Sequence, residues 1–225
     1  MERKELNNKI GNIRNWNNLN MMFDEPTHKY YVNGKNYPSV SGFVNELRTE
    51  EEKEKFNSPE FQEFLKPYAE FGTYIHKETE KYDRGIKLEP TDYEEKEWIA
   101  LERYETLTNK LKDNGFEIMA IELPIFVDDY GVCGTIDRLF YNEETKKVML
   151  VDIKTGSTRE AHWQQQLIYS ELLLQWGIKV DSIGLVSLKL KNKIPTFKGL
   201  KDLVKDKLVE QVNKLLNDKK KEERG

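Results

Sequence analysis

Three charged residues interrupt apolar, β-branched runs in the middle of the chain. Asp137 lies within GTIDRLF, and Asp152 and Lys154 lie within VMLVDIKTG. Side chains alternate between the faces of a β-strand, so Asp152 and Lys154 are expected on one face and Ile153 on the other. A buried carboxylate is costly unless it is paired or bound to a metal. The pattern therefore predicts either a salt bridge at the end of a sheet or a site for a divalent cation.

The two interpretations differ in their chemistry. Carboxylates supply the oxygen ligands that suit Mg²⁺ or Mn²⁺. Such an ion beside a lysine can activate water and stabilise the charge that develops at a phosphorus centre. D-x-K alone is a common tripeptide, and without further context it favours the salt bridge.

Four short motifs in a fixed order supply that context. In chain order they are GTYIH at residues 72–76, GTID at 134–137, DIK at 152–154 and QQLIY at 165–169. The set resembles the RecB-like branch of the PD-(D/E)XK nuclease superfamily, whose pattern is G-x-x-x-H, G-x-x-D, (D/E)-x-K and Q-x-x-x-Y. The stretch HKYYVNGKNYPSVSGF also resembles the start of phage-encoded and mitochondrial-type exonucleases of this branch. The resemblance covers about residues 28–190.

The resemblance implies roles for the charged strand residues. Asp137 and Asp152 would bind the catalytic metal, Mg²⁺ or Mn²⁺ as one ion or two, with the carbonyl of Ile153 as a third oxygen. Lys154 would position or deprotonate the attacking water, or stabilise the developing charge. A partly desolvated lysine near a metal can have a lowered pKa, so both roles stay open.

Two further residues join the implied metal site. His76 would add an imidazole ligand, which Mn²⁺ tolerates better than Mg²⁺. Taken without the motif, His76 is an ordinary histidine on a helix surface. Glu122, in AIELPIF, stands where related enzymes carry an accessory carboxylate. Glu80 follows His76 by one helical turn and shares its face.

A third group is implied to face DNA. Gln165 and Tyr169 are four residues apart and share one helix face, and His162 joins them from the preceding turn. Thr155 directly follows the D-x-K motif. The structural alternative for the helical residues is an ordinary polar flank.

The single cysteine, Cys133, limits the possible chemistry. It excludes an intramolecular disulfide, a Cys-rich zinc module and the iron–sulfur cluster that some relatives of the branch carry. A reduced setting is expected. No run of about 18 apolar residues predicts a membrane span, and no apolar segment near the N-terminus predicts a secretory signal. We therefore expect a cytoplasmic protein, in the host cytoplasm if the chain is phage-encoded.

Composition alone argues against a protein that coats nucleic acid. Of 225 residues, 37% are hydrophobic and 34% charged, and the formal net charge is −4. The charge is unevenly distributed, because residues 46–105 hold 10 basic and 18 acidic side chains and residues 185–225 hold 12 basic and 6 acidic ones. An acidic helical region thus precedes a basic end.

The first half of the chain predicts short elements that lead into helices. Residues 1–27 are rich in asparagine and predict a flexible segment. Residues 28–37 predict a β-hairpin around an Asn-Gly turn. A short helix is expected from a cap at Ser39 or Ser41 to Leu47. Residues 50–70 are expected to be helical with breaks at Pro59 and Pro67. A further helix should follow residue 70 and stop at Gly85, and another should cover residues 92–114.

The second half predicts strands and two helices. Three β-rich runs, at residues 117–127, 131–142 and 146–156, predict an antiparallel meander. An S-x-x-E capping box at Ser157 and Glu160 would start a helix that ends at Gly177. A strand follows at residues 181–190, and residues 198–225 predict a basic amphipathic helix. That helix has one packed stripe, and its basic face is either solvated or in contact with phosphate.

This order of elements predicts an α/β fold with a restriction-endonuclease-like core, in which helices flank a mixed central sheet. The hairpin and the extra helices are additions to that core. No linker-like stretch divides the chain, so we expect one nuclease domain over residues 1–225.

The expected function is a metal-dependent DNA exonuclease that acts in replication, recombination or repair and is encoded by a phage. DNA is the expected substrate, and a homo-oligomer or a replication or recombination protein partner stays open. Two alternatives share the fold: an endonuclease, and a non-catalytic DNA-binding or assembly protein. The second predicts the loss of a metal ligand, whereas Asp137, Asp152 and Lys154 are all present.

Overall fold

A mixed β-sheet forms the centre of the structure, a computed structural model that describes residues 1–24, 27, 29–189, 196–199 and 202–224. Its strands are β4 (Phe116–Val127), β5 (Val132–Asn142), β6 (Lys147–Lys154), β7 (Ser182–Ser187) and β8 (Thr196–Gly199), in that spatial order. β4, β5 and β6 form the predicted antiparallel meander, and β7 lies parallel to β6. The mixed α/β core with flanking helices is therefore confirmed.

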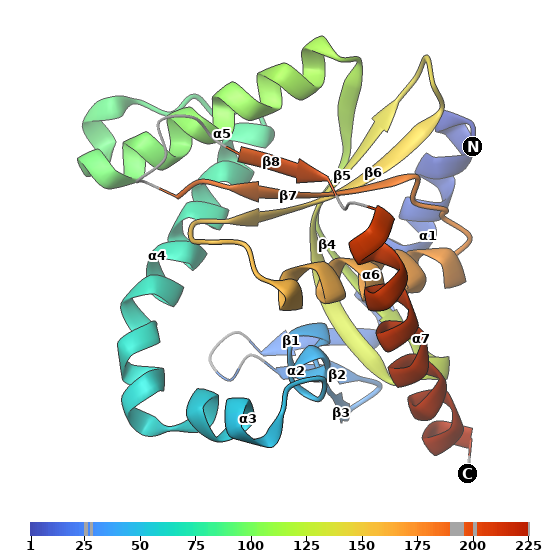
Figure 1. Ribbon diagram of the computed structural model, residues 1–225. Coiled ribbons are helices and arrows are strands. Elements are labelled where there is room, and N and C mark those ends of the chain that lie inside the picture. The colour runs from blue at the N-terminus through green and yellow to red at the C-terminus, as the bar shows by residue number, and fades with distance from the viewer. Residues whose placement is uncertain (25–26, 28, 190–195, 200–201, 225) are drawn as a thin grey trace.

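Helices cover both faces of this sheet (Figure 1). On one face pack α1 (Arg3–Asn20), α2 (Val40–Asn45), α6 (Glu160–Gln175) and α7 (Asp202–Arg224). On the other face pack α4 (Pro59–Asp83) and α5 (Glu95–Asp113). The helix α3 (Glu50–Asn57) precedes α4, and two short 3₁₀ turns lie at Pro90–Asp92 and Asp128–Tyr130.

Alternation along β6 divides the core between the two faces. Val148 and Leu150 belong to the cluster under α6, whereas Val151 and Ile153 belong to the cluster under α4 and α5. The parallel β6–β7 pair requires a crossover connection, and α6 provides it. The end of β6 is thus held from both sides.

A separate three-stranded sheet precedes α2. It consists of β1 (Met21–Asp24), β2 (Lys29–Val32) and β3 (Lys35–Tyr37). Asn33 and Gly34 between β2 and β3 have φ of 50° and 79°, as a type I′ turn requires. The predicted hairpin is confirmed, and Ser39, whose Oγ accepts from the N–H of Gly42, is the cap of the next helix.

The prediction of a flexible N-terminal segment was wrong. Helix α1 buries Leu6, Ile10 and Ile13 against the sheet, at helical spacing. Asparagine dominates the composition of this segment, but three apolar residues on one stripe suffice to dock a helix. Residues 25, 26 and 28, at the end of this segment and the start of the hairpin, lie outside the described residues.

Two predicted boundaries also differ. Pro67 does not break α4, because a proline in a helix removes one hydrogen bond and bends the helix without necessarily ending it. Helix α6 begins at Glu160 and not at a Ser157 cap; the N–H of Arg159 donates to Nδ1 of His162 instead (3.2 Å). A histidine acceptor near the helix start thus replaces the expected serine.

The C-terminal helix begins at Asp202, because residues 196–199 form β8. Its apolar stripe is confirmed by the burial of Leu208, Val212 and Leu216. Residues 200, 201 and 225 of the predicted helix, and residue 190 of the predicted strand, lie outside the described residues. Over the described part of the chain, no helix combines the length and hydrophobicity that a membrane span requires.

Candidate active site

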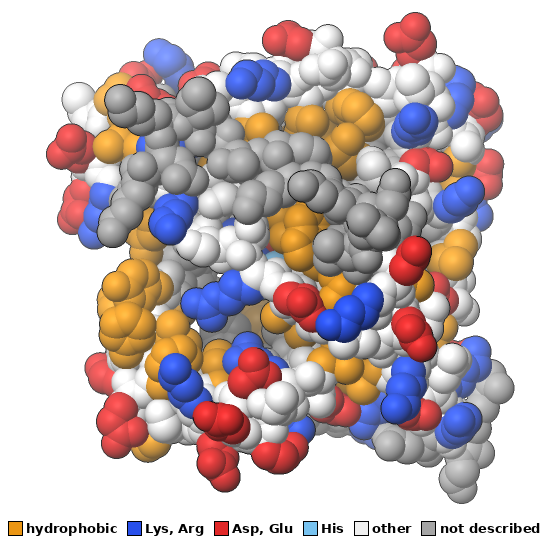
Figure 2. Space-filling model, viewed as in Figure 1, with side chains coloured by type: hydrophobic (Ala, Val, Ile, Leu, Met, Phe, Trp, Pro, Cys, Tyr) orange, Lys and Arg blue, Asp and Glu red, His pale blue; other side chains and the backbone are white. Residues whose placement is uncertain are grey.

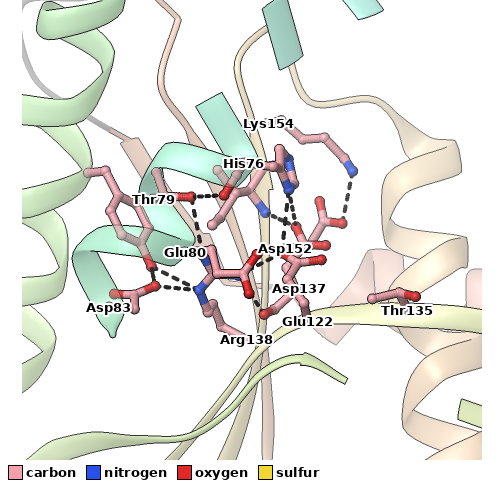
Figure 3. A network of polar contacts seen from close by, with 12 residues as sticks. His76, Thr79, Glu80, Asp83, Glu122, Thr135, Asp137, Arg138, Asp152 and Lys154 are labelled. Carbon is pink, nitrogen blue, oxygen red and sulfur yellow. Dashed lines mark hydrogen bonds and ion pairs between the residues drawn. The ribbon is translucent and has the colours of Figure 1, made fainter. Parts of the chain in front are cut away.

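Three side chains from different elements converge beside the end of β6. His76 comes from α4, Glu122 from β4 and Asp137 from β5, and their ligand atoms lie within 4.8 Å of one another. His76 Nδ1 is 3.6 Å from Asp137 Oδ2 and 3.9 Å from Glu122 Oε1. Figure 3 shows these side chains pointing toward one another. The structure thus brings together three of the predicted metal ligands.

The backbone of Ile153 ties this cluster to the D-x-K motif. Its N–H donates to Asp137 Oδ2 (2.8 Å), and its carbonyl accepts from His76 Nε2 (2.9 Å). Because Nε2 donates, Nδ1 is the nitrogen that faces the carboxylates. Burial lowers the pKa of His76, but Asp137 and Glu122 outweigh burial and raise it.

Asp152 and Lys154 share one face of β6, as predicted. Lys154 Nζ donates to Asp152 Oδ1 (2.8 Å), and Asp152 is only 2% exposed. Burial, reinforced by the charge of Asp137, raises the pKa of Asp152 to about 6 although Lys154 opposes it. Burial lowers the pKa of Lys154, but Asp152 and Asp137 outweigh burial and raise it. Lys154 is therefore held in its charged form.

The donor set fits a divalent cation. Carboxylate oxygens and one imidazole are ligands of Mg²⁺, Mn²⁺ and related ions. Among the described residues, the buried Oδ2 of Asp152 has no hydrogen-bond partner. An unpaired buried carboxylate oxygen is costly, and a cation is one way to satisfy it. His76, Glu122 and Asp137 would hold such an ion, and Asp152 supplies a further oxygen.

Glu122 reaches the cluster through an unusual backbone conformation. Its φ is 43°, in the left-handed region that non-glycine residues rarely adopt. In the β4–β5 register it stands between Ile121, paired with Arg138, and Leu123, paired with Ile136. Such conformations cost about 1–3 kcal/mol and cluster at functional sites. The position of Glu122 in the site is thus maintained against local strain.

Sequence reasoning missed the residue that holds Glu122. Arg138 is fully buried, and it donates to Asp83 Oδ2 (2.5 Å), Glu122 Oε1 (2.8 Å) and Thr79 Oγ1 (3.1 Å). The available signal was an arginine inside an apolar strand, directly after Asp137. Because Arg138 connects the metal-ligand candidates to α4, it is a positioning residue of this site.

The residues predicted to face DNA lie in different surroundings. His162 and Thr155 line one pocket together with Lys154. Gln165 donates to Ser41 Oγ (3.1 Å), and Tyr169 is buried. Burial, with the charge of Lys154 next, lowers the pKa of His162 to about 4, so His162 is neutral at physiological pH.

Glu80, the residue one turn after His76, pairs with Arg84 (2.7 Å). Figure 3 includes it beside the Arg138 contacts. This ion pair lies at the C-terminal end of α4, whose cap residue is Arg84.

Tyr169 packs directly on Gly134. Its hydroxyl accepts from the N–H of Thr135 (3.2 Å), and a Cβ on Gly134 would lie 2.5 Å from that hydroxyl oxygen. We expect Gly134→Ala to destabilise the fold by about 1–3 kcal/mol, because a rigid buried ring cannot yield to the added methyl group. Urea unfolding measures this difference.

The matched control for that substitution is Gly11→Ala. Gly11 lies in α1 with nothing within 4 Å of a Cβ. Alanine is the better helix former, so this variant should be neutral or slightly more stable. Equal stability of the two variants would show that the contact between Gly134 and Tyr169 is not tight.

Comparison with known proteins gives one family match. The model of the PD-(D/E)XK nuclease superfamily matches residues 47–224. No significant match is found among curated proteins. Of solved structures, the crystal structure of SSO0001 is similar at 18% identity and a TM-score of 0.34, over 79% of this chain and 75% of that one. LHK-Exo in complex with dAMP is similar at 12% identity and a TM-score of 0.37, over 84% of this chain and 90% of that one.

Proposed function

Because this chain belongs to the PD-(D/E)XK nuclease superfamily, a group of metal-dependent nucleases, we propose that it is a DNA exonuclease of the RecB-like branch. One observation carries the proposal: the cluster of His76, Glu122 and Asp137 lies beside the Asp152–Lys154 pair. The ordered motifs that match the branch support the finer assignment. Mg²⁺ or Mn²⁺ is the proposed cofactor, as one ion or two.

The roles of the residues follow from their contacts. His76, Glu122, Asp137 and Asp152 would hold the cation, and the Ile153 carbonyl, which accepts from His76 Nε2, would orient the imidazole for that role. When bound, such a cation polarises a phosphate oxygen and lowers the pKa of a coordinated water. Arg138 fixes Glu122, which therefore stays preorganised.

Lys154 is proposed to stabilise negative charge that develops on the scissile phosphate. Its side chain is 23% exposed, and its ammonium group is held by Asp152 (2.8 Å). The raised pKa of Lys154 favours the charged form, which suits electrostatic stabilisation better than removal of a proton from water. His162, which is neutral and lines the same pocket, is available to orient the substrate.

The proposed setting is DNA replication, recombination or repair, in the cytoplasm of a host cell if the gene is carried by a phage. DNA is the proposed substrate, with His162 and Thr155 toward it in the pocket beside Lys154, and with Gln165 and the buried Tyr169 as supporting residues of that side. A homo-oligomer or a replication or recombination protein is a proposed partner. We propose no iron–sulfur cofactor, because the chain has a single cysteine and such a cluster needs several.

Linear and closed circular DNA of one sequence separate an exonuclease from an endonuclease. With Mg²⁺ or Mn²⁺, we expect the linear form to be degraded from its ends and the closed circle to persist, as followed on agarose gels. An Asp137→Ala variant purified in the same way excludes a contaminating nuclease. Conversion of the circle to nicked or linear product would support the endonuclease.

A further inference from the structure

A pocket of about 660 Å³ opens beside Lys154, and its described lining includes none of His76, Glu122 and Asp137. One wall is α4, and the opposite wall is the segment Thr155–Arg159 that follows β6. We call this the α4 pocket. Thr155 and Gly72 approach each other where the two walls meet, since a Cβ on Gly72 would lie 3.5 Å from Thr155 Oγ1. Lys154 lines the α4 pocket and also pairs with Asp152, so the pocket borders the candidate active site.

The α4 wall carries exposed aromatic rings. Phe64 and Tyr68 line the pocket and are 60% and 63% exposed, and their ring centroids are 5.5 Å apart. They continue a ladder in which Phe61 stacks on Phe64 (6.2 Å) and contacts Phe56 of α3 (6.2 Å). Large exposed apolar groups that are gathered in one place mark binding surfaces.

The two outer rings of this ladder do not belong to the core. Neither Phe64 nor Tyr68 packs into any of the buried clusters of the described structure, and most of α4 between Glu60 and Glu70 is exposed. Figure 2 shows a hydrophobic patch over α4, at the left, beside a hollow flanked by basic side chains. The rings therefore serve no evident purpose in folding.

The charged side chains that line the pocket are all basic. Lys96, Arg159 and Lys189 lie around it together with Lys154, and none of its described lining residues is acidic. This is a strong local departure for a chain with net charge −4. Lys189 Nζ is held by Ser157 Oγ (3.0 Å), so its charge is directed along the wall opposite α4.

We propose that the α4 pocket binds single-stranded DNA, with bases stacked on Phe64 and Tyr68 and phosphates against Arg159 and Lys189. The inference rests on the proposed nuclease function, whose scissile phosphate would lie at Lys154. Aromatic rings on one side and cations on the other match a single strand, whose bases and backbone lie on opposite sides. A duplex hides its base faces and cannot stack on the rings. The substrate is therefore a single-stranded end.

Metal-free binding tests this proposal without relying on cleavage. Fluorescence anisotropy in EDTA at low salt compares three labelled probes of equal length: a single strand, a hairpin duplex and a strand of abasic sites. The wild-type chain should bind the normal strand more tightly than the abasic strand or the hairpin, because only the normal strand offers free base faces to the rings. This comparison requires no variant. Equal affinity for the two strands overturns the proposal.

A pair of double variants isolates the rings. Phe64→Leu with Tyr68→Leu keeps apolar bulk but removes both aromatic faces, and single-strand binding should weaken by roughly tenfold to several hundredfold. Phe64→Trp with Tyr68→Trp keeps the faces and should retain affinity. The leucine and the tryptophan double variants should bind the abasic strand equally well. Leu174→Ala, at an exposed apolar residue outside the pocket, is the control.

The outcomes distinguish this inference from the proposed function. If the leucine variant binds single strands as the wild type does, the inference fails. The exposed rings would then be a surface for a protein partner. An equal loss on the abasic strand also overturns stacking. If no DNA is cut with any metal but these binding differences hold, the proposed function fails and the inference stands.

Discussion

Replacement of Lys154 by alanine is expected to lower the rate of DNA cleavage by about a hundredfold to a thousandfold, the loss typical of one preorganised electrostatic group. Lys154 lies at the junction of the metal-ligand cluster and the α4 pocket. Its loss also removes the only hydrogen bond described for the Asp152 carboxylate, so the pKa of Asp152 should rise further above its ordinary range. Initial rates on linear DNA with Mg²⁺ or Mn²⁺ measure the effect.

Lys87→Ala is the matched control for that substitution. Lys87 is 85% exposed in its side chain and pairs only with Glu89 among the described contacts. Its removal should leave the rate unchanged. Asp152→Ala belongs in the same experiment, because it removes both the unpaired oxygen and the partner of Lys154. Cleavage that survives both Lys154→Ala and Asp152→Ala would contradict the mechanism.

Replacement of Arg138 by methionine is expected to destabilise the fold by about 3–5 kcal/mol, the cost of breaking a buried ion pair by removing one partner. Arg138 is fully buried, and its guanidinium contacts both Asp83 and Glu122. Methionine fills a similar volume, so a cavity contributes little to the lost stability. The loss comes from the missing charge and hydrogen bonds of the guanidinium group. Urea unfolding of the metal-free chain gives the difference in free energy.

Two further variants test whether the loss of stability comes from the buried ion pairs of Arg138. Arg84→Met removes an exposed arginine that pairs with Glu80 and should cost at most about 1 kcal/mol. Adding Asp83→Asn to Arg138→Met removes one of the two stranded carboxylates and should recover part of the stability. A cost below about 1 kcal/mol for Arg138→Met would show that the buried pair does not hold the site together.

The net charge of the chain is a poor guide to its surfaces. A value of −4 argues against bulk attraction to nucleic acid. Yet carboxylates such as Asp137 and Asp152 gather where a cation fits, and a bound cation inverts the local field. The α4 pocket is basic although its helix lies in the acidic stretch of residues 46–105. Local arrangement, and not the total, determines where phosphate can bind.

Local signals predicted the parts of the fold that local chemistry determines. The Asn33-Gly34 turn and the shared face of Asp152 and Lys154 follow from backbone preference and strand alternation, and both are confirmed. Arg138 was missed because its partners, Asp83 and Glu122, stand far from it in sequence. Only the packing of α4 on the sheet turns a strand arginine into the centre of a buried network.

Segments with mixed signals were harder to predict. In α1, polar composition outweighed a sparse apolar stripe at Leu6, Ile10 and Ile13, because the docking surface for that stripe comes from distant strands. In α4, the spacing of Phe61, Phe64 and Tyr68 is compatible with a stripe of core residues as well as with an exposed binding face. Exposure distinguishes a binding face from a core face, and exposure is a property of the fold.

Digestion of end-labelled linear DNA with and without divalent metal tests the central claim most directly. With Mg²⁺ or Mn²⁺, the wild-type chain should shorten the labelled strand progressively from an end, and EDTA or Asp137→Ala should abolish the reaction. Intact DNA with both metals, or equal digestion in EDTA, would contradict a metal-dependent nuclease at this site.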